Sequence, residues 1–244
     1  MASKNKIPAK NSIRLLDSVA FLNSYYGAAL NGMITVNFQQ LGLTSEKDSA
    51  NALTKLNEAL ADKIGRYGRN WNYYLPHQFV YVHEYVQSHG HHAHELLVVP
   101  KGLGAELHSW LTDWADRNYP GSDPDAVRFG ARYPKDLDKR AIQQRNLVRY
   151  VLKSTEDACI HGLDGEPTTL HTILGITDKH ERAYCATVRR VTGSSENIAN
   201  RAQLRGGFWP PQHLETVLTD RYLRNWQAGR QADELWRMLN SIDI

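Results

Sequence analysis

The stretch that decides the fold is Gly90-His91-His92-Ala93-His94-Glu95-Leu96-Leu97-Val98-Val99. Its apolar second half predicts a buried β-strand, in which successive side chains point to opposite faces. His92 and His94 would therefore share one face, with Cα atoms roughly 7 Å apart given the rise of a strand. Two imidazoles at this spacing can occupy two positions around one divalent metal ion. The alternative is that the histidines are only the polar end of a buried strand.

A second strand is predicted directly upstream, at 78–86, so that the two strands form a β-hairpin. The length of its turn decides which residue faces the histidines. A three-residue loop, with Gly90 left-handed in a bulge, places Glu84 opposite His94. A two-residue loop places His83 there instead. Gly90 stands where the bulge requires a glycine, which favours Glu84 as the third ligand. One carboxylate and two imidazoles suit Mg²⁺, Mn²⁺ or Zn²⁺ with coordination positions left open.

The order of the remaining elements predicts an α+β fold. Apolar periodicity gives the order strand, helix, strand, strand, helix, strand, helix, which suits a central antiparallel sheet with flanking helices. Its first six elements follow the ferredoxin-like βαββαβ motif. The predicted strands are 32–38, 78–86, 91–99 and 126–133, and the predicted helices are 44–66, 103–118 and 136–157.

Capping residues and glycines mark the expected ends of two predicted helices. Asn11 or Ser12 is expected to cap a first helix that Gly27 ends, and Gly65 and Gly68 are expected to end the helix over 44–66. Residues 159–167 have no clear pattern, and 212–240 reads as one or two helices. We therefore divide the chain into a core over 1–157 and a basic, largely helical C-terminal extension over 158–244.

Positive charge is concentrated in two stretches of this 244-residue chain, although its net charge is only +3. Such clusters are typical of phosphate binding, and the alternative is a solvated basic face. The first stretch contains eight basic residues: Arg128, Arg132, Lys135, Lys139, Arg140, Arg145, Arg149 and Lys153. The second contains six: Lys179, Arg182, Arg189, Arg190, Arg201 and Arg205.

Other compositional features point to a cytoplasmic protein. There is no run of 18 apolar residues, so no contact with a membrane is expected. The first eight residues lack the apolar core of a secretory signal. Cys159 and Cys185 are too few for a disulfide scaffold and form no Cys-x-x-Cys motif, so both are expected to be reduced.

Tyr150 and Lys153 form a second chemical feature, three residues apart on the predicted helix 136–157 and on one face of it. Gln143 and Asn146 lie on the same side. A tyrosyl oxygen can attack a phosphodiester as a covalent nucleophile. A nearby ammonium would favour the phenolate or neutralise charge in the transition state. The alternative is an ordinary, partly buried surface tyrosine.

Together, these features resemble the HUH endonuclease family, which comprises rolling-circle replication initiators, relaxases and related transposases. Three motifs occur in the order found in single-tyrosine initiators, and the similarity covers roughly residues 30–157. The first is Ile34-Thr35-Val36-Asn37-Phe38, the second is His92-Ala93-His94 and the third is Tyr150-Val151-Leu152-Lys153. Lys153 and Ser154 stand where the two-tyrosine subclass has its second tyrosine. The chain also has no Gly-x-x-x-x-Gly-Lys motif, so no fused helicase is expected.

The resemblance implies a metal-dependent, site-specific nick in single-stranded or hairpin origin DNA of a plasmid or phage, in the cytoplasm of a bacterial host. Tyr150 would form a 5′-phosphotyrosine and leave a 3′-hydroxyl for a host polymerase, and Lys153 would assist. Glu84, His92 and His94 would hold Mg²⁺ or Mn²⁺. DNA contacts are expected from Thr35, Asn37, Arg145, Asn146 and Arg149.

Other functions are compatible with these residues. The protein could be a relaxase or transposase of the same family, although the motif order favours an initiator. It could be a non-catalytic DNA-binding regulator of replication, or a metallohydrolase without a covalent intermediate. For residues 158–244, binding of duplex origin DNA, recruitment of a host helicase and completion of the core all remain open.

Overall fold

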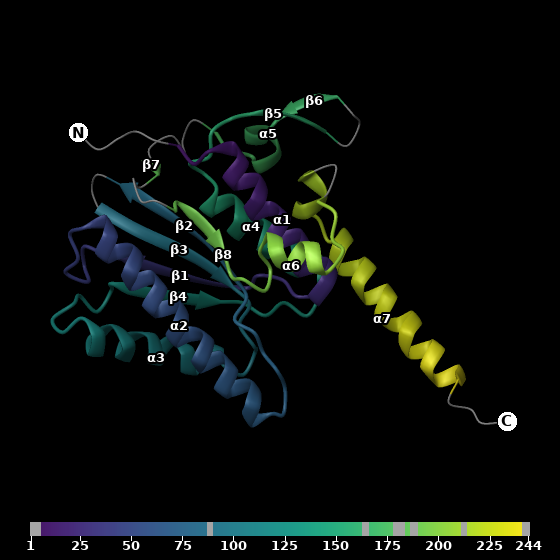
Figure 1. The fold of residues 1–244 in the computed structure, drawn as a ribbon, viewed down its shortest axis with the longest axis horizontal. Coiled ribbons are helices and arrows are strands. Elements are labelled where there is room, and N and C mark those ends of the chain that lie inside the picture. Colours follow the sequence, from purple (N-terminus) through teal and green to yellow (C-terminus); the bar gives the residue numbers. More distant parts are fainter. Residues whose placement is uncertain are drawn as a thin grey trace.

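The computed structural model describes residues 6–86, 90–162, 166–177, 184–185, 190–210 and 214–240, of which 184–185 and 232–240 are described by their backbone alone. Figure 1 shows a central sheet with helices around it. The turn at 87–89 and the predicted phosphate-binding residues Lys179, Arg182 and Arg189 lie outside the described residues.

The central sheet confirms the predicted α+β class. Its main strands are β1 (Gly32–Asn37), β2 (Phe79–Val86), β3 (Gly90–Leu97) and β4 (Val127–Ala131), in the order β4-β1-β3-β2 and with antiparallel neighbours. Because β1 and β2 both run antiparallel to β3, they are parallel to each other and are separated by it. This is the split connectivity of a βαββαβ motif. The outer edge of β2 pairs with β7 (Tyr184–Cys185) and β8 (Thr192–Ser194).

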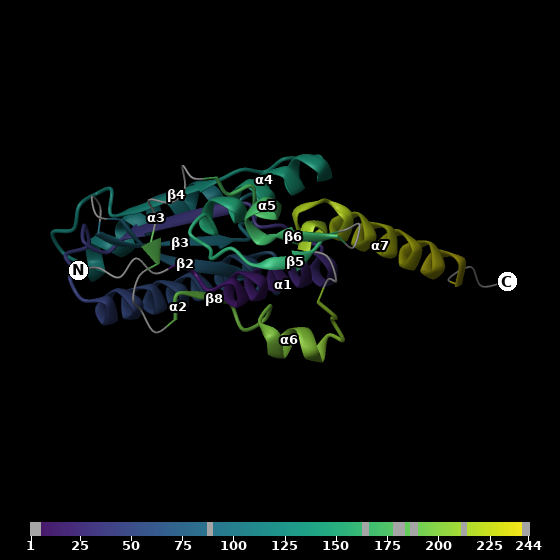
Figure 2. The same ribbon diagram turned by 90° about the horizontal axis from the view of Figure 1, so that it is seen from above.

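Two layers of helices cover the two faces of this sheet. The helices α2 (Glu46–Asn70) and α3 (Gly104–Asn118) pack on the face that carries Ala93 and Leu97. The helices α1 (Ala9–Tyr26) and α4 (Leu137–Val151) pack on the face that carries Val80, Val82 and Leu96. Figure 1 shows α2 and α3 together below the strands and α1 and α4 together above and to the right, and Figure 2 gives the view from above. Each fully buried aliphatic side chain contributes about 1.5–3 kcal/mol to stability.

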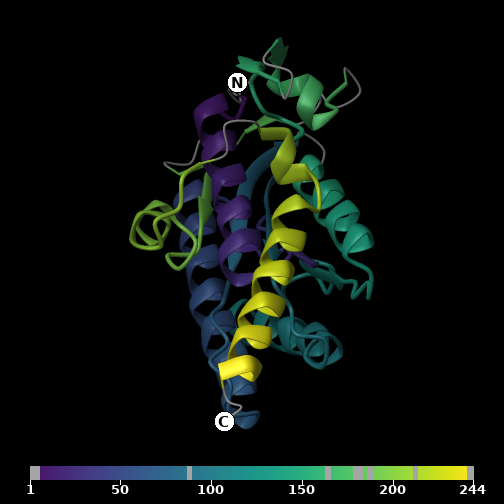
Figure 3. The same cartoon turned by 90° about the vertical axis from the view of Figure 1, so that its right-hand side faces the viewer.

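The C-terminal part of the chain joins the α1/α4 layer. After the small hairpin of β5 (Cys159–His161) and β6 (Pro167–Thr169) come α5 (Leu170–Leu174), α6 (Asn200–Arg205), the 3₁₀ helix η2 (Leu214–Leu218) and α7 (Arg221–Asn240). Leu170, Leu174, Ile198 and Val217 are buried in the same hydrophobic cluster as α1. The far end of α7 extends away from the rest of the molecule (Figures 1 and 2), and Figure 3 views the molecule from that side. Through β8 and this cluster, the C-terminal part completes the same sheet and core.

Three of the predicted boundaries were wrong. The first helix begins after Pro8, and Ser12 lies inside it, where its hydroxyl is 2.8 Å from Thr155 Oγ1. The glycines at 65 and 68 do not end α2, which continues to Asn70. The helix α4 begins as predicted at the Asp136 cap but ends at Val151, before Lys153. The stretch 159–167, to which no structure was assigned, contains β5 and the first residue of β6.

A buried amide, Gln144, fixes α4 against α1. Its Oε1 accepts hydrogen bonds from Leu30 N at 2.9 Å and Asn23 Nδ2 at 3.1 Å, and its Nε2 donates to Asn23 Oδ1 at 2.7 Å. Gln144→Ala leaves the Leu30 amide and Asn23 Oδ1 without these partners, so we expect the free energy of unfolding to fall by about 2–4 kcal/mol. Urea denaturation measures this loss. The control is Asn146→Ala, an exposed amide on the same helix, and an equal loss in both variants would contradict this role of Gln144.

Candidate metal centre

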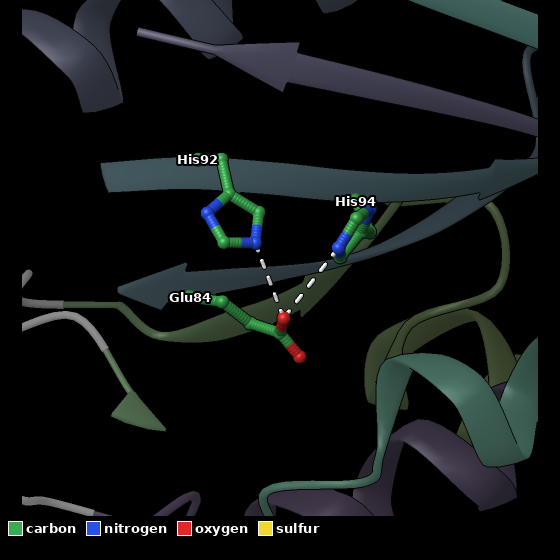
Figure 4. Close-up of side chains that lie close together, drawn as sticks. All are labelled: Glu84, His92 and His94. Atoms are coloured by element: carbon green, nitrogen blue, oxygen red, sulfur yellow. Dashed lines mark hydrogen bonds and ion pairs between the residues drawn. The ribbon is translucent and has the colours of Figure 1, made fainter. Parts of the chain in front are cut away.

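Three side chains from the hairpin converge on the sheet face that α4 covers. Glu84 on β2 is the register partner of His92 on β3, and His94 lies two residues further along the same face. Glu84 Oε2 is 3.3 Å from His92 Nε2 and 3.5 Å from His94 Nε2 (Figure 4). One ligand atom from each residue lies within 4.8 Å of the others. Among the described residues, this group therefore has the composition and spacing of a metal site.

The hairpin register differs from the predicted one by two residues. Glu84 was expected opposite His94, whereas the structure pairs Val86 with Gly90 and Glu84 with His92. Gly90 has the expected left-handed backbone, with φ at 68°. A shift of two preserves which face each side chain takes, so Glu84 stays on the face of the histidines.

His83, the other possible third ligand, points to the opposite face of the sheet. It is the register partner of Ala93, and its Nδ1 lies 3.0 Å from His91 Nε2. Phe38 stacks on its ring, and burial lowers the pKa of His83 to about 3. The structure thus groups Glu84, and not His83, with the two histidines.

The protonation states of this group suit metal coordination. Glu84 is 0% exposed, and burial alone would raise the pKa of its carboxyl. His92, His94 and the charge of Lys153 outweigh burial, and the pKa falls well below its usual range. Burial is also the main reason that the pKa of His94 is lowered. At neutral pH the site therefore offers a carboxylate and a neutral imidazole, the forms that bind metal ions.

Hydrogen bonds behind the histidines orient their Nε2 atoms toward Glu84. His92 Nδ1 donates to the carbonyl oxygen of Gly90 at 3.3 Å, and His94 Nδ1 lies 2.9 Å from Thr35 Oγ1. With a metal ion bound and the proton on Nδ1, each Nε2 would offer its lone pair to the ion. In the described part of the chain, Glu84 Oε1 and His94 Nε2 are buried without a hydrogen-bond partner. A cation among these atoms would satisfy them, so the residues fit a divalent metal.

Thr35 was predicted to contact DNA, and its position also supports a second role. Among the described residues, only the Thr35 hydroxyl forms a side-chain hydrogen bond with His94 Nδ1. Thr35 therefore orients the ring of His94, one of the candidate metal ligands. Thr35→Val keeps the shape and removes this hydrogen bond. We expect Mn²⁺ affinity to fall by about tenfold, measured by isothermal titration. Thr54→Val on α2 serves as the control, and equal affinities in both variants would exclude this role.

Tyr150 and Lys153 reach the metal centre from the end of α4. The Tyr150 ring lies 5.1 Å from the His94 ring, at 70° to it, and Tyr150 is 46% exposed. Lys153 Nζ is 2.6 Å from Glu84 Oε2 and 4.1 Å from the centre of the Tyr150 ring. Burial and then the charge of Glu84 raise the pKa of the Tyr150 phenol. Lys153 therefore pairs with the carboxylate, and the phenol stays protonated at neutral pH.

A pocket of about 400 Å³ opens above these residues. Thr35 and Asn37, two of the predicted DNA contacts, line it because they are the register partners of His94 and His92. Arg128, the partner of Thr35 on β4, also lines it. Arg128 was predicted only as part of a basic stretch. Its place beside the site depends on the β1–β4 pairing, which charge alone does not reveal.

The three predicted DNA contacts on α4 lie outside this pocket. Asn146 is exposed in a neighbouring groove that Tyr150 also lines. Arg149 Nη2 donates to the carbonyl oxygen of Ile173 at 3.1 Å, at the end of α5. Arg145 is half-buried, and its charge lowers the pKa of Arg149 in addition to the effect of burial. The structure thus joins Thr35 and Asn37 to the metal centre and separates the two arginines from it.

The opposite face of the sheet holds a buried pair that the sequence analysis missed. His77 Nε2 lies 3.2 Å from Glu95 Oε1, and both side chains are almost completely buried. Glu95 follows His94 on β3, so its side chain points away from the metal centre. The sequence offered one signal for this pair. The side chains of β3 alternate between the two faces, so Glu95 must point to the α2/α3 face, opposite to His94.

Comparison with protein-family models, curated proteins and solved structures finds no match. Within the described part of the chain, no helix combines the length and apolarity needed to cross a membrane.

Proposed function

We propose that this protein is a metal-dependent endonuclease that nicks single-stranded DNA through a covalent tyrosine intermediate and so initiates rolling-circle replication. One observation carries the proposal: the ring of Tyr150 lies 5.1 Å from that of His94, a member of a buried Glu-His-His group that fits a divalent ion. A nucleophile, a metal site and an ammonium thus share one pocket. The similarity of the three motifs to HUH endonucleases supports the same function.

The proposed reaction is a transesterification. The Oη of Tyr150 forms a bond to phosphorus as the bond between phosphorus and O3′ breaks. The phenolic proton leaves Tyr150, and the departing 3′ oxygen gains a proton. The products are a 5′-phosphotyrosine and a free 3′-hydroxyl from which a host polymerase can extend. A Mg²⁺ or Mn²⁺ ion held by Glu84, His92 and His94 would polarise the phosphate and offset its negative charge.

Lys153 and Thr35 have supporting roles in this proposal. The ammonium of Lys153 lies between Glu84 and the Tyr150 ring, where it offsets negative charge that develops near the phenol. Thr35 holds His94 in the orientation that turns Nε2 into the site. The carboxylate is fully buried, so the phosphate must enter the pocket to reach the ligands. A flexible single strand can do so more readily than a duplex, which favours single-stranded or unpaired hairpin DNA as substrate.

Formation of a covalent adduct tests this proposal. The purified protein is incubated with a pool of labelled single-stranded oligonucleotides and Mn²⁺, then denatured and separated by gel electrophoresis. We expect a labelled band at the mass of protein plus DNA, which protease removes and which EDTA prevents. Mass spectrometry should locate the phosphate on the peptide that contains Tyr150. A pool of plasmid and phage origin sequences would yield the preferred site.

The result also separates the other functions. A metallohydrolase would cleave the DNA without an adduct, and a replication regulator would bind it without cleavage. Either outcome would contradict the proposed covalent mechanism. Relaxases and transposases would form the same adduct, and origin-dependent replication of a test plasmid would separate an initiator from them.

A further inference from the structure

A second hollow begins at Tyr150 and continues away from the metal centre. It has a volume of about 670 Å³ and lies between α4 and the strands β1 and β4. We call it the α4 groove. Tyr150 lines both the α4 groove and the metal pocket, so the two are adjacent. Its other apolar lining residues are Met33, Ala131, Pro134, Ile142 and Leu147.

The polar residues around the α4 groove are basic or neutral. Arg132 and Lys139 line it, together with the amides of Asn31, Gln143 and Asn146. A smaller hollow of about 290 Å³ shares Arg132 and Gln143 with it and adds three further cations, namely Lys101, Lys135 and Arg140. Among the described residues, no acidic side chain lines either hollow. This charge is complementary to a polyanion.

We propose that the α4 groove holds the single-stranded DNA segment next to the scissile phosphate. An apolar floor with a basic rim is how proteins hold single strands, because bases cover the apolar surface while Lys and Arg contact the phosphates. The exposed Ile142 and the ring of Tyr150 provide such a floor, and Lys139 and Arg132 such a rim. This inference rests on the proposed function, since it adds the path of the strand to the cleavage site.

Gly130 keeps the α4 groove open. It is the register partner of Met33, and a Cβ at this position would meet no atom of the described residues within 4 Å. A large side chain here would therefore enter the groove from β4 without displacing the backbone. Gly130→Phe blocks the groove, whereas Gly130→Ala leaves most of it free and serves as the matched control.

The experiment measures binding of fluorescent oligo(dT) of 10 and 30 nucleotides by anisotropy, in EDTA so that cleavage is not required. We expect Gly130→Phe to weaken binding by at least about tenfold, the equivalent of one lost base-stacking contact. Gly130→Ala should bind like the unaltered protein. Lys139→Glu should also weaken binding. The slope of log affinity against log salt concentration should become shallower by about 0.7, the value for one phosphate contact on a single strand. Lys55→Glu, an exposed charge reversal on α2, should have neither effect.

The outcomes separate this inference from the proposed function. Unchanged affinity in both Gly130→Phe and Lys139→Glu, with circular dichroism spectra like that of the unaltered protein, would overturn the inference. If the unaltered protein still formed the covalent adduct, the proposed function would stand without this path. The converse result is weakened binding in both variants without any adduct in the unaltered protein. It would support DNA binding in the α4 groove and contradict the proposed nuclease function. Because Lys139 is exposed, its variant gives a result even if Gly130→Phe fails to fold.

Discussion

Tyr150→Phe is expected to abolish the covalent DNA adduct while leaving DNA binding largely intact. The substitution removes only Oη, the atom proposed to attack phosphorus. The phenyl ring can keep its place beside the His94 ring and beneath the ammonium of Lys153. The loss should therefore concern the reaction and not the shape of the pocket. The measurement is the denaturing gel with labelled oligonucleotide and Mn²⁺, with oligonucleotide anisotropy run in parallel.

Tyr74→Phe provides the matched control for this experiment. Tyr74 is 89% exposed and does not line the metal pocket or the α4 groove. Its substitution should leave both adduct and binding unchanged. An adduct that persists in Tyr150→Phe would assign the nucleophile to another residue, and one that disappears in both variants would point to a general effect of losing a tyrosine.

Glu84→Gln is expected to remove metal binding and to lower stability. Glutamine preserves the shape of the side chain but removes the only anionic ligand of the group. Mn²⁺ affinity should fall by more than about 100-fold, beyond the effect of losing a supporting hydrogen bond. The variant also leaves the Lys153 ammonium without its carboxylate at 2.6 Å, and breaking such a buried pair costs about 3 kcal/mol or more. Isothermal titration and urea denaturation measure the two effects.

The stability loss in Glu84→Gln should depend on pH in one direction. The folded-state pKa of Glu84 lies below its unfolded value, so the carboxylate stabilises the fold above that unfolded value, about 4.3. This contribution is lost as the pH falls further. The difference in unfolding free energy between the unaltered protein and the variant should therefore be largest near neutral pH and shrink below about pH 4. A difference that grows in acid would contradict the assigned charge state.

Glu95→Gln separates metal binding from stability. Glu95 is as deeply buried as Glu84 but lies on the α2/α3 face, beside His77. Its substitution should lower stability without changing Mn²⁺ affinity. A similar loss of affinity in both variants would show that metal binding had failed through unfolding, and would contradict a specific role for Glu84.

The parts of the fold that follow from local periodicity could be predicted. Alternating side chains identified β2 and β3, and helical spacing identified α2, α3 and α4. The group of Glu84, His92 and His94 followed from the same alternation once Gly90 indicated the parity of the turn. The exact pairing of Glu84 with His92 did not follow, because several turn lengths have the same parity and place the same faces together.

The remaining differences come from tertiary packing. Ser12 lies inside α1, where its hydroxyl pairs with Thr155, a residue far away in the sequence. The guanidinium of Arg149 donates to the end of α5, a contact between residues distant in the sequence that charge alone does not reveal. The short strands β7 and β8 pair with backbone groups at the edge of β2. The local sequence pattern of these two segments does not indicate this pairing. The role of Gln144 likewise depends on where α1 lies.

The pairing of Val86 with Gly90 has a consequence for how this protein can evolve. One residue gained or lost in the three-residue segment between them would force one strand to exchange its two faces. His83 would then replace Glu84 beside the histidines, and Val80 and Val82 would leave their hydrophobic cluster. Adding two residues would preserve both. Single-codon insertions and deletions in this segment should therefore be selected against, whereas changes by two codons should be tolerated.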